Sequence, residues 1–88
     1  MPRPLAISPK FKKVLASKPV ALQAAIAKCV TRLADDVTHP GLHVHKMRGL
    51  REPVWEAYVD AGNRITFHYE GDTIVLRMNC HHDILRRP

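Results

Sequence analysis

The sequence has no long apolar run and little cysteine. No stretch approaches the roughly 20 apolar residues that a membrane-spanning helix requires, and residues 1–4 lack the hydrophobic stretch of a secretory signal peptide. Two cysteines, Cys29 and Cys80, do not make a disulfide framework, and both are expected to be thiols in a reducing cytosol. These absences predict a cytoplasmic protein that has no membrane partner.

Metal ligands are also too scattered for a recognisable centre. His81 and His82 follow Cys80 directly, which by itself is compatible with a metal site or a nucleophile. A zinc site needs a second cluster with suitable spacing, and the sequence contains none. We therefore expect no metal and no cofactor.

What the sequence does contain is an ordinary globular composition with an excess of positive charge. The 88 residues are 45% hydrophobic and 25% charged, and they show no repeat, low-complexity stretch or linker. Residues 1–88 are therefore expected to form one domain. The formal net charge is +6 at pH 7, which in a short chain favours a polyanionic partner, either nucleic acid or an acidic protein segment.

The first part of the chain predicts one strand followed by a helix. Residues 5–7 are apolar and bounded by prolines, as expected for a short strand. Ser8 and Pro9 are of the types preferred at an N-cap and at the first helical position. This helix should end near residues 17–18, because the residue before Pro19 resists the α conformation.

A second helix is predicted from Pro19 to the acidic pair at residues 35–36. Apolar side chains recur at helical spacing, and the alanines between them permit close packing against the first helix. The tight turn at Pro19 predicts that the two helices form an antiparallel hairpin. The apolar positions are Leu22, Ile26, Cys29, Val30 and Leu33.

Three strands are predicted in the C-terminal part. They cover residues 54–59, 64–69 and 73–79, with turns at residues 60–63 and 70–72. Alternation assigns to the core Trp55, Ala57, Val59, Ile65, Phe67, Tyr69, Ile74, Leu76 and Met78. It assigns to an opposite, polar face Glu56, Tyr58, Arg64, Thr66, His68, Thr73, Val75, Arg77 and Asn79. The expected fold is α+β: a helical hairpin packed on a mostly antiparallel four-stranded sheet, ordered strand, two helices and three strands, with a short C-terminal turn.

Basic and imidazole side chains gather at two places. Five lie within residues 43–51, before the predicted sheet: His43, His45, Lys46, Arg48 and Arg51. The second place is residues 80–83, Cys-His-His-Asp, which end the last strand. Imidazole titrates near neutral pH and arginine stays charged, so such groups near strand ends suit a phosphate-binding or RNA-cleaving site. A solvated loop and an ordinary strand terminus fit the same residues, and both interpretations stay open.

The order and spacing of several motifs resemble one protein family. These motifs are the Phe11-Lys12-Lys13 helix, the segment 45–49, the strand 54–59, Arg64-Ile65 at the start of the next strand, and residues 81–83. Over nearly its whole length the chain resembles the RelE/ParE superfamily of toxins from bacterial type II toxin–antitoxin systems. The resemblance implies a compact α/β fold, with an N-terminal helical hairpin on a mostly antiparallel sheet.

The resemblance also implies a toxic activity of one of two classes. Many members are endoribonucleases that cut mRNA in the decoding site of the ribosome, while a related branch poisons DNA gyrase. Each toxin is neutralised by an antitoxin whose disordered, often acidic segment folds onto it, and the complex commonly represses its own operon through operator DNA. We expect a metal-independent endoribonuclease. The alternative is a noncatalytic gyrase inhibitor, or an inactive toxin-fold module that binds antitoxin and DNA.

Individual residues acquire roles from the same resemblance. Arg64 matches a strand arginine that grips the phosphate near the cleaved bond. His82 matches a late position that contacts this phosphate or protonates the leaving group, and His81 is the alternative for that position. His45 and Lys46 match basic positions just before the sheet.

The match departs from the family's lysine-type ribonucleases in the first strand of the meander. Those members have lysines there, whereas this chain has Glu56 and Tyr58, which leaves a histidine-type mechanism. Metal-free RNA cleavage needs a base, a cationic group at the phosphorane and an acid. The expected acid is His82, and the expected base is His45 or, as the alternative, Glu56. Arg64 would hold the phosphate, and the further RNA- or phosphate-binding residues would be Lys46, Arg48, Arg51, Tyr58 and Arg77.

Overall fold

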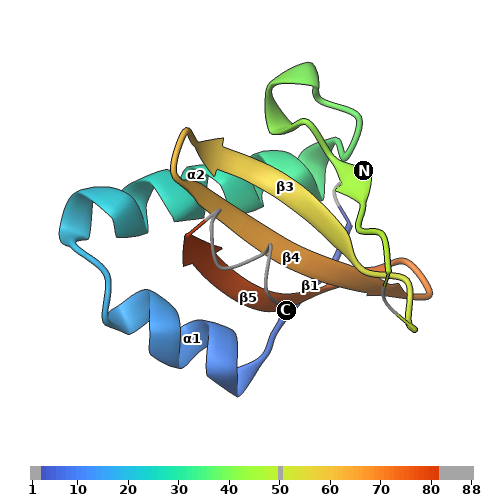
Figure 1. Ribbon diagram of the computed structural model, residues 1–88, viewed down its shortest axis with the longest axis horizontal. Coiled ribbons are helices and arrows are strands. Elements are labelled where there is room, and N and C mark those ends of the chain that lie inside the picture. Colours follow the sequence, from blue (N-terminus) through green and yellow to red (C-terminus); the bar gives the residue numbers. More distant parts are fainter. Residues whose placement is uncertain (1–2, 50, 82–88) are drawn as a thin grey trace.

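The computed structural model describes residues 3–49 and 51–81, for residues 80 and 81 the backbone alone. Two helices and a five-stranded mixed sheet make up an α+β fold (Figure 1). In chain order the elements are β1 (Leu5–Ile7), α1 (Pro9–Ala16), α2 (Val20–Asp35), the short 3₁₀ helix η1 (Pro40–Leu42), β2 (His45–Lys46), β3 (Trp55–Asp60), β4 (Asn63–Glu70) and β5 (Thr73–His81). The predicted fold class is confirmed.

The sheet has the strand order β1-β5-β4-β3-β2, with β1 parallel to β5 and the other neighbours antiparallel. The prediction of four strands was one short. His45 pairs with Glu56 and Lys46 pairs with Trp55, and the amide of Met47 extends this ladder by donating to the Val54 carbonyl at 2.8 Å. Two residues are too few to show the alternation by which a strand is recognised in a sequence.

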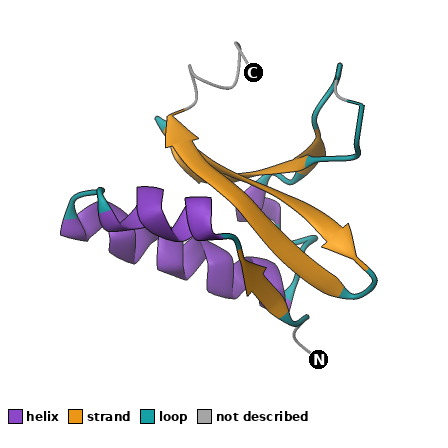
Figure 2. Ribbon diagram, turned by 90° about the horizontal axis from the view of Figure 1, so that it is seen from below, coloured by secondary structure: helices purple, strands orange, loops and turns teal. Residues whose placement is uncertain are grey.

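Both helices lie on the same side of the sheet (Figure 2). The predicted N-cap is confirmed, because Ser8 Oγ accepts a hydrogen bond from the amide of Phe11 at 3.1 Å. Helix α1 ends at Ala16, before Pro19, as expected. The core between helices and sheet contains Phe11, Ile26, Cys29, Leu33, Leu42, Ala57, Ile65, Phe67, Ile74 and Leu76. No helix within the described part of the chain is long and apolar enough to cross a membrane.

A β-bulge in β5 changes which side chains face the core. Thr66 pairs with Met78 but the next residue, Phe67, pairs with Leu76, so Arg77 is an extra residue in the ladder. An extra residue reverses the alternation beyond it. The prediction was therefore wrong for the last residues of this strand: Asn79 is buried in the core, whereas Met78 turns to the polar face.

Cys29 is predicted to make the protein sensitive to alkaline pH. Its thiol is buried, donates to the Tyr58 carbonyl at 3.4 Å, and has its pKa raised to about 11 by burial. The unfolded chain ionises this thiol near its ordinary pKa, so the contribution to stability is full below about pH 8.5 and is lost as pH rises toward the folded pKa. In chemical denaturation, the stability advantage of the wild type over Cys29→Ala should shrink by about 2–3 kcal/mol between pH 8 and 11. A stability difference between the wild type and Cys29→Ala that stays constant between pH 8 and 11 would contradict this prediction.

Candidate functional site

The polar face is the sheet surface opposite the two helices. Strand pairing brings to it His45 from β2, Glu56 and Tyr58 from β3, Arg64, Thr66 and His68 from β4, and Met78 from β5. Residues far apart in the sequence therefore meet here, as expected for a binding surface on a rigid sheet. Two groups of polar contacts can be distinguished on it, one around Arg64 and one around Arg77.

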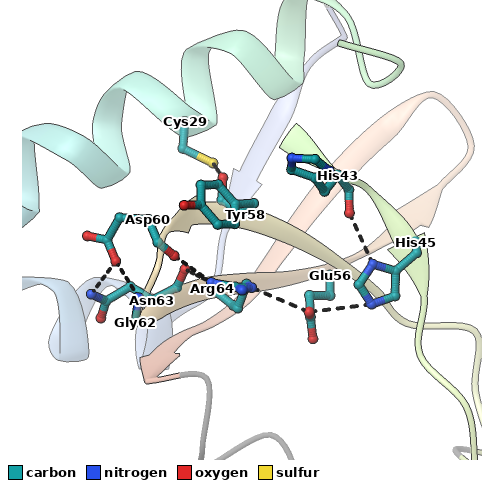
Figure 3. Close-up of polar contacts among 9 residues, drawn as sticks. All are labelled: Cys29, His43, His45, Glu56, Tyr58, Asp60, Gly62, Asn63 and Arg64. Carbon is teal, nitrogen blue, oxygen red and sulfur yellow. Dashed lines mark hydrogen bonds and ion pairs between the residues drawn. The ribbon is translucent and has the colours of Figure 1, made fainter. Parts of the chain in front are cut away.

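Arg64 is held by several contacts of its guanidinium group (Figure 3). Nη1 donates to the carbonyl oxygens of Asp60 and Asn63 at 2.5 and 2.9 Å. Nε lies 3.6 Å from the Glu56 carboxylate, and the group stacks 4.6 Å from the centre of the Tyr58 ring. The side chain is only 14% exposed, so a fixed, partly desolvated positive charge is available at this place.

The hairpin turn that precedes Arg64 is stabilised by its own side chains. The Asp60 carboxylate accepts hydrogen bonds from Asn63 Nδ2 and from the amide of Gly62, each at 2.9 Å. The bond from Asn63 has the largest part in lowering the pKa of Asp60 below its ordinary value. An Asx-type turn of this kind fixes the backbone carbonyls to which Arg64 donates.

Glu56 links Arg64 to His45. Its carboxylate is buried and lies 3.4 Å from His45 Nε2, while His45 Nδ1 lies 3.0 Å from the His43 carbonyl (Figure 3). A carbonyl and an ionised carboxylate are both acceptors, so only the doubly protonated imidazolium satisfies the two contacts together. His45 therefore has the partners of a proton donor.

His68 and Arg77 form the second group. Arg77 Nη1 lies 3.1 Å from His68 Nδ1, and His68 Nε2 lies 3.3 Å from the carboxylate of Glu70. Arginine can only donate, so Nδ1 accepts and Nε2 carries the hydrogen, which is the neutral tautomer. Arg77 also lies 3.7 Å from the exposed carboxylate of Glu52. The contacts of His68 are thus those of a histidine that keeps an arginine in place.

The structure does not gather all the predicted site residues. Lys46 projects away from the polar face, where its amine lies 6.0 Å from the centre of the Trp55 ring. Arg48 and Arg51 are exposed in the loop between β2 and β3, and Arg51 lines a shallow cavity beside Arg77. The backbone of His81 pairs with Asn63, but its side chain and the whole of His82 lie outside the described residues.

Two features of this surface were not apparent from the sequence. Glu56 was expected on the polar face, but nothing in the sequence indicated that it would be buried between Arg64 and His45. His43 was noted only as part of a basic loop, yet its ring packs edge-on against Tyr58 at 5.4 Å. Within the described part of the chain, no three His, Cys, Asp or Glu side chains converge as a metal site would require.

Comparison with known proteins was informative for structure alone. Neither models of protein families nor curated protein sequences match this chain. A chain of the archaeal RelE–RelB complex from Pyrococcus horikoshii superimposes with a TM-score of 0.73 at 16% identity, covering 92% of this chain and 96% of that one. A chain of the toxin–antitoxin complex RelBE2 from Mycobacterium tuberculosis gives a TM-score of 0.76 at 14% identity, covering 93% of this chain and 100% of that one.

The chain has the RelE/ParE toxin fold. A YoeB/ParE toxin from Agrobacterium tumefaciens is also similar, with a TM-score of 0.74 at 9% identity over 90% of this chain and 98% of that one. At such identities the side chains differ almost everywhere, so the likeness concerns the RelE/ParE toxin fold and not the chemistry of the polar face. Function has to be argued from the residues placed on that fold.

Proposed function

We propose that this protein is the toxin of a type II toxin–antitoxin system and acts as a metal-independent endoribonuclease on ribosome-bound mRNA. The observation that carries the proposal is the fixed guanidinium of Arg64 on the polar face, within a network that includes an imidazole and a carboxylate. The RelE/ParE toxin fold supports it, since similar structures are named as RelE, YoeB and YafQ.

In the proposed reaction, the RNA 2′-oxygen attacks the adjacent phosphorus and the 5′-oxygen leaves, giving a 2′,3′-cyclic phosphate and a free 5′-hydroxyl. Arg64 would supply positive charge where negative charge develops on the phosphorane oxygens, from a position fixed before the substrate arrives. Tyr58 offers an aromatic ring on which an RNA base would stack. The Arg64 guanidinium already lies 4.6 Å from the centre of this ring.

The two proton transfers are assigned from the hydrogen-bond partners. Because both ring nitrogens of His45 face acceptors, its contacts favour donation of a proton to the leaving 5′-oxygen over the role of base. Removal of the 2′-hydroxyl proton then falls to Glu56, the alternative base, or to a late histidine, His82 or His81. The sequence had suggested His82 as the acid and His45 as the base, so this assignment reverses the roles of the two histidines.

The proposed partners follow from charge and from the fold. A net charge of +6 favours an antitoxin segment that is acidic or disordered and folds onto the toxin. Two of the similar structures are toxin–antitoxin complexes by name, RelE–RelB and RelBE2. We propose that the antitoxin complex, rather than the toxin alone, binds operator DNA.

Ribosome toeprinting tests the proposed function. Purified protein added to mRNA-programmed ribosomes should produce new stops at the A site within minutes, and free mRNA of the same sequence should stay largely intact. In parallel, the protein should leave DNA gyrase supercoiling unchanged. Inhibition of supercoiling without toeprint stops would reject the endoribonuclease in favour of the gyrase inhibitor. Absence of both effects, with the protein folded and its antitoxin bound, would favour an inactive toxin-fold module.

A further inference from the structure

A cavity of about 430 Å³ opens on the polar face where the start of α1 meets β4 and β5. It lies within the range of volumes typical of small-molecule sites. Its lining consists of Ser8, Lys10, Thr66, His68, Val75, Arg77 and Met78. Arg77 is the one lining residue predicted from the sequence to bind RNA or phosphate, and Lys10 and Met78 have no part in the mechanism proposed above.

The β-bulge at Arg77 builds the floor of this cavity. By reversing the alternation, it turns Met78 to the same face as Thr66 and Val75, which gives an apolar floor on an otherwise polar surface. Ser8 helps to fix the geometry, since its hydroxyl donates to the Arg77 carbonyl at 3.2 Å while capping α1. Methionine adapts its shape readily and makes favourable contacts with aromatic rings.

The rim of the cavity carries positive charge. Lys10 and Arg77 contribute cationic groups, and no acidic side chain is among the lining residues that the structure describes. Within residues 3–49 and 51–81, Lys10 makes no ion pair. Arg77 is 40% exposed and is oriented by His68 at 3.1 Å. An apolar floor with two cations at its edge matches a flat ring joined to a phosphate.

We propose that this cavity is a nucleotide subsite, in which a base lies on Met78 and Val75 and its phosphate contacts Lys10 and Arg77. The subsite rests on the proposed RNA substrate and places a second nucleotide beside the one at Arg64. Arg64, Thr66 and His68 project from the same face of β4, so the cavity begins about 7 Å from Arg64 along the strand. The subsite would therefore hold the nucleotide that flanks the cleaved bond.

Nuclear magnetic resonance titrations of the full chain with 5′-UMP, 5′-AMP and inorganic phosphate test the subsite. Both nucleotides should shift the methyl signal of Met78 and the amide of Val75, whereas phosphate alone should shift the amide of Lys10 and leave the Met78 methyl unmoved. Lys10→Ala should weaken nucleotide binding about tenfold. Lys12→Ala removes the same charge from an exposed position of α1 outside the cavity, and should weaken it less than about twofold. Met78→Gln should make the affinities for nucleotide and phosphate similar.

Equal weakening by Lys10→Ala and Lys12→Ala would overturn the subsite, as would nucleotides that leave the Met78 methyl unmoved. A glutamate-rich peptide that shifts this methyl when nucleotides do not would assign the cavity to an acidic protein segment instead. The titration does not depend on cleavage. Nucleotide binding without toeprint stops would reject the endoribonuclease and keep the subsite. Toeprint stops without nucleotide binding would keep the endoribonuclease and reject the subsite.

Discussion

If the proposed endoribonuclease reaction holds, replacing Arg64 by alanine is expected to lower the rate of mRNA cleavage on the ribosome by at least about 100-fold, because the change removes the positive charge assigned to the developing phosphorane. The same change removes the hydrogen bonds to the Asp60 and Asn63 carbonyls, so a loss of stability of about 2 kcal/mol is expected as well. Toeprinting under single-turnover conditions measures the first effect, and urea denaturation followed by Trp55 fluorescence measures the second.

Two further variants separate catalysis from stability and from net charge. Arg32→Ala removes one positive charge from an exposed position of α2, on the helix side of the sheet, and should leave cleavage within about twofold of the wild type. Arg64→Lys keeps the charge but lacks the planar fork that contacts two carbonyls and Glu56, so an intermediate rate is expected. A folded Arg64→Ala protein that cleaves at the wild-type rate would remove Arg64 from the mechanism.

Much of this fold could be predicted from the sequence because its local signals agree with one another. Ser8 and Pro9 marked the start of α1, Pro19 separated the helices, and alternation in residues 54–69 assigned both faces of β3 and β4 correctly at most positions. These signals act over a few residues, and each is decided by backbone sterics or by one hydrogen bond.

The bulge in β5 could not be predicted in this way. Strict alternation in residues 73–79 placed Met78 inside and Asn79 outside, and an apolar methionine fits that pattern better than a buried asparagine. What decides the register is long-range: the Phe11 carbonyl accepts a hydrogen bond from Asn79 Nδ2 at 2.9 Å, and Ser8 bonds to the Arg77 carbonyl. These partners are nearly 70 residues away in sequence.

The candidate site shows the same division between local and long-range signals. Arg64 and His45 were predicted from the sequence as site residues, and both belong to one network on the polar face. The central role of Glu56 in that network could not be identified, because burial of a carboxylate depends on strands that meet only in the folded sheet. The nucleotide subsite was hidden for the same reason, since it depends on the bulge at Arg77.

Asn79→Asp is expected to destabilise the protein by at least about 3 kcal/mol at pH 7. Asn79 is 1% exposed, and its Oδ1 has no hydrogen-bond partner among the described residues. The substitution is isosteric, but at neutral pH it replaces the donor to the Phe11 carbonyl by a buried negative charge 2.9 Å from an oxygen atom. For a domain of this size such a loss is a large fraction of the total stability.

The loss should depend on pH in a direction that identifies its cause. Burial raises the pKa of the introduced carboxyl in the folded state, so the variant is most stable below the unfolded value of about 3.9 and loses stability as pH rises. In its protonated form the carboxyl can donate to the Phe11 carbonyl as the amide does. The difference in unfolding free energy from the wild type should therefore be small near pH 4 and increase by up to about 1.4 kcal/mol per pH unit above it. Asn79→Ala, which introduces no charge, should show a loss of about 2 kcal/mol at every pH, and an equally constant loss in Asn79→Asp would mean that its carboxyl reaches solvent.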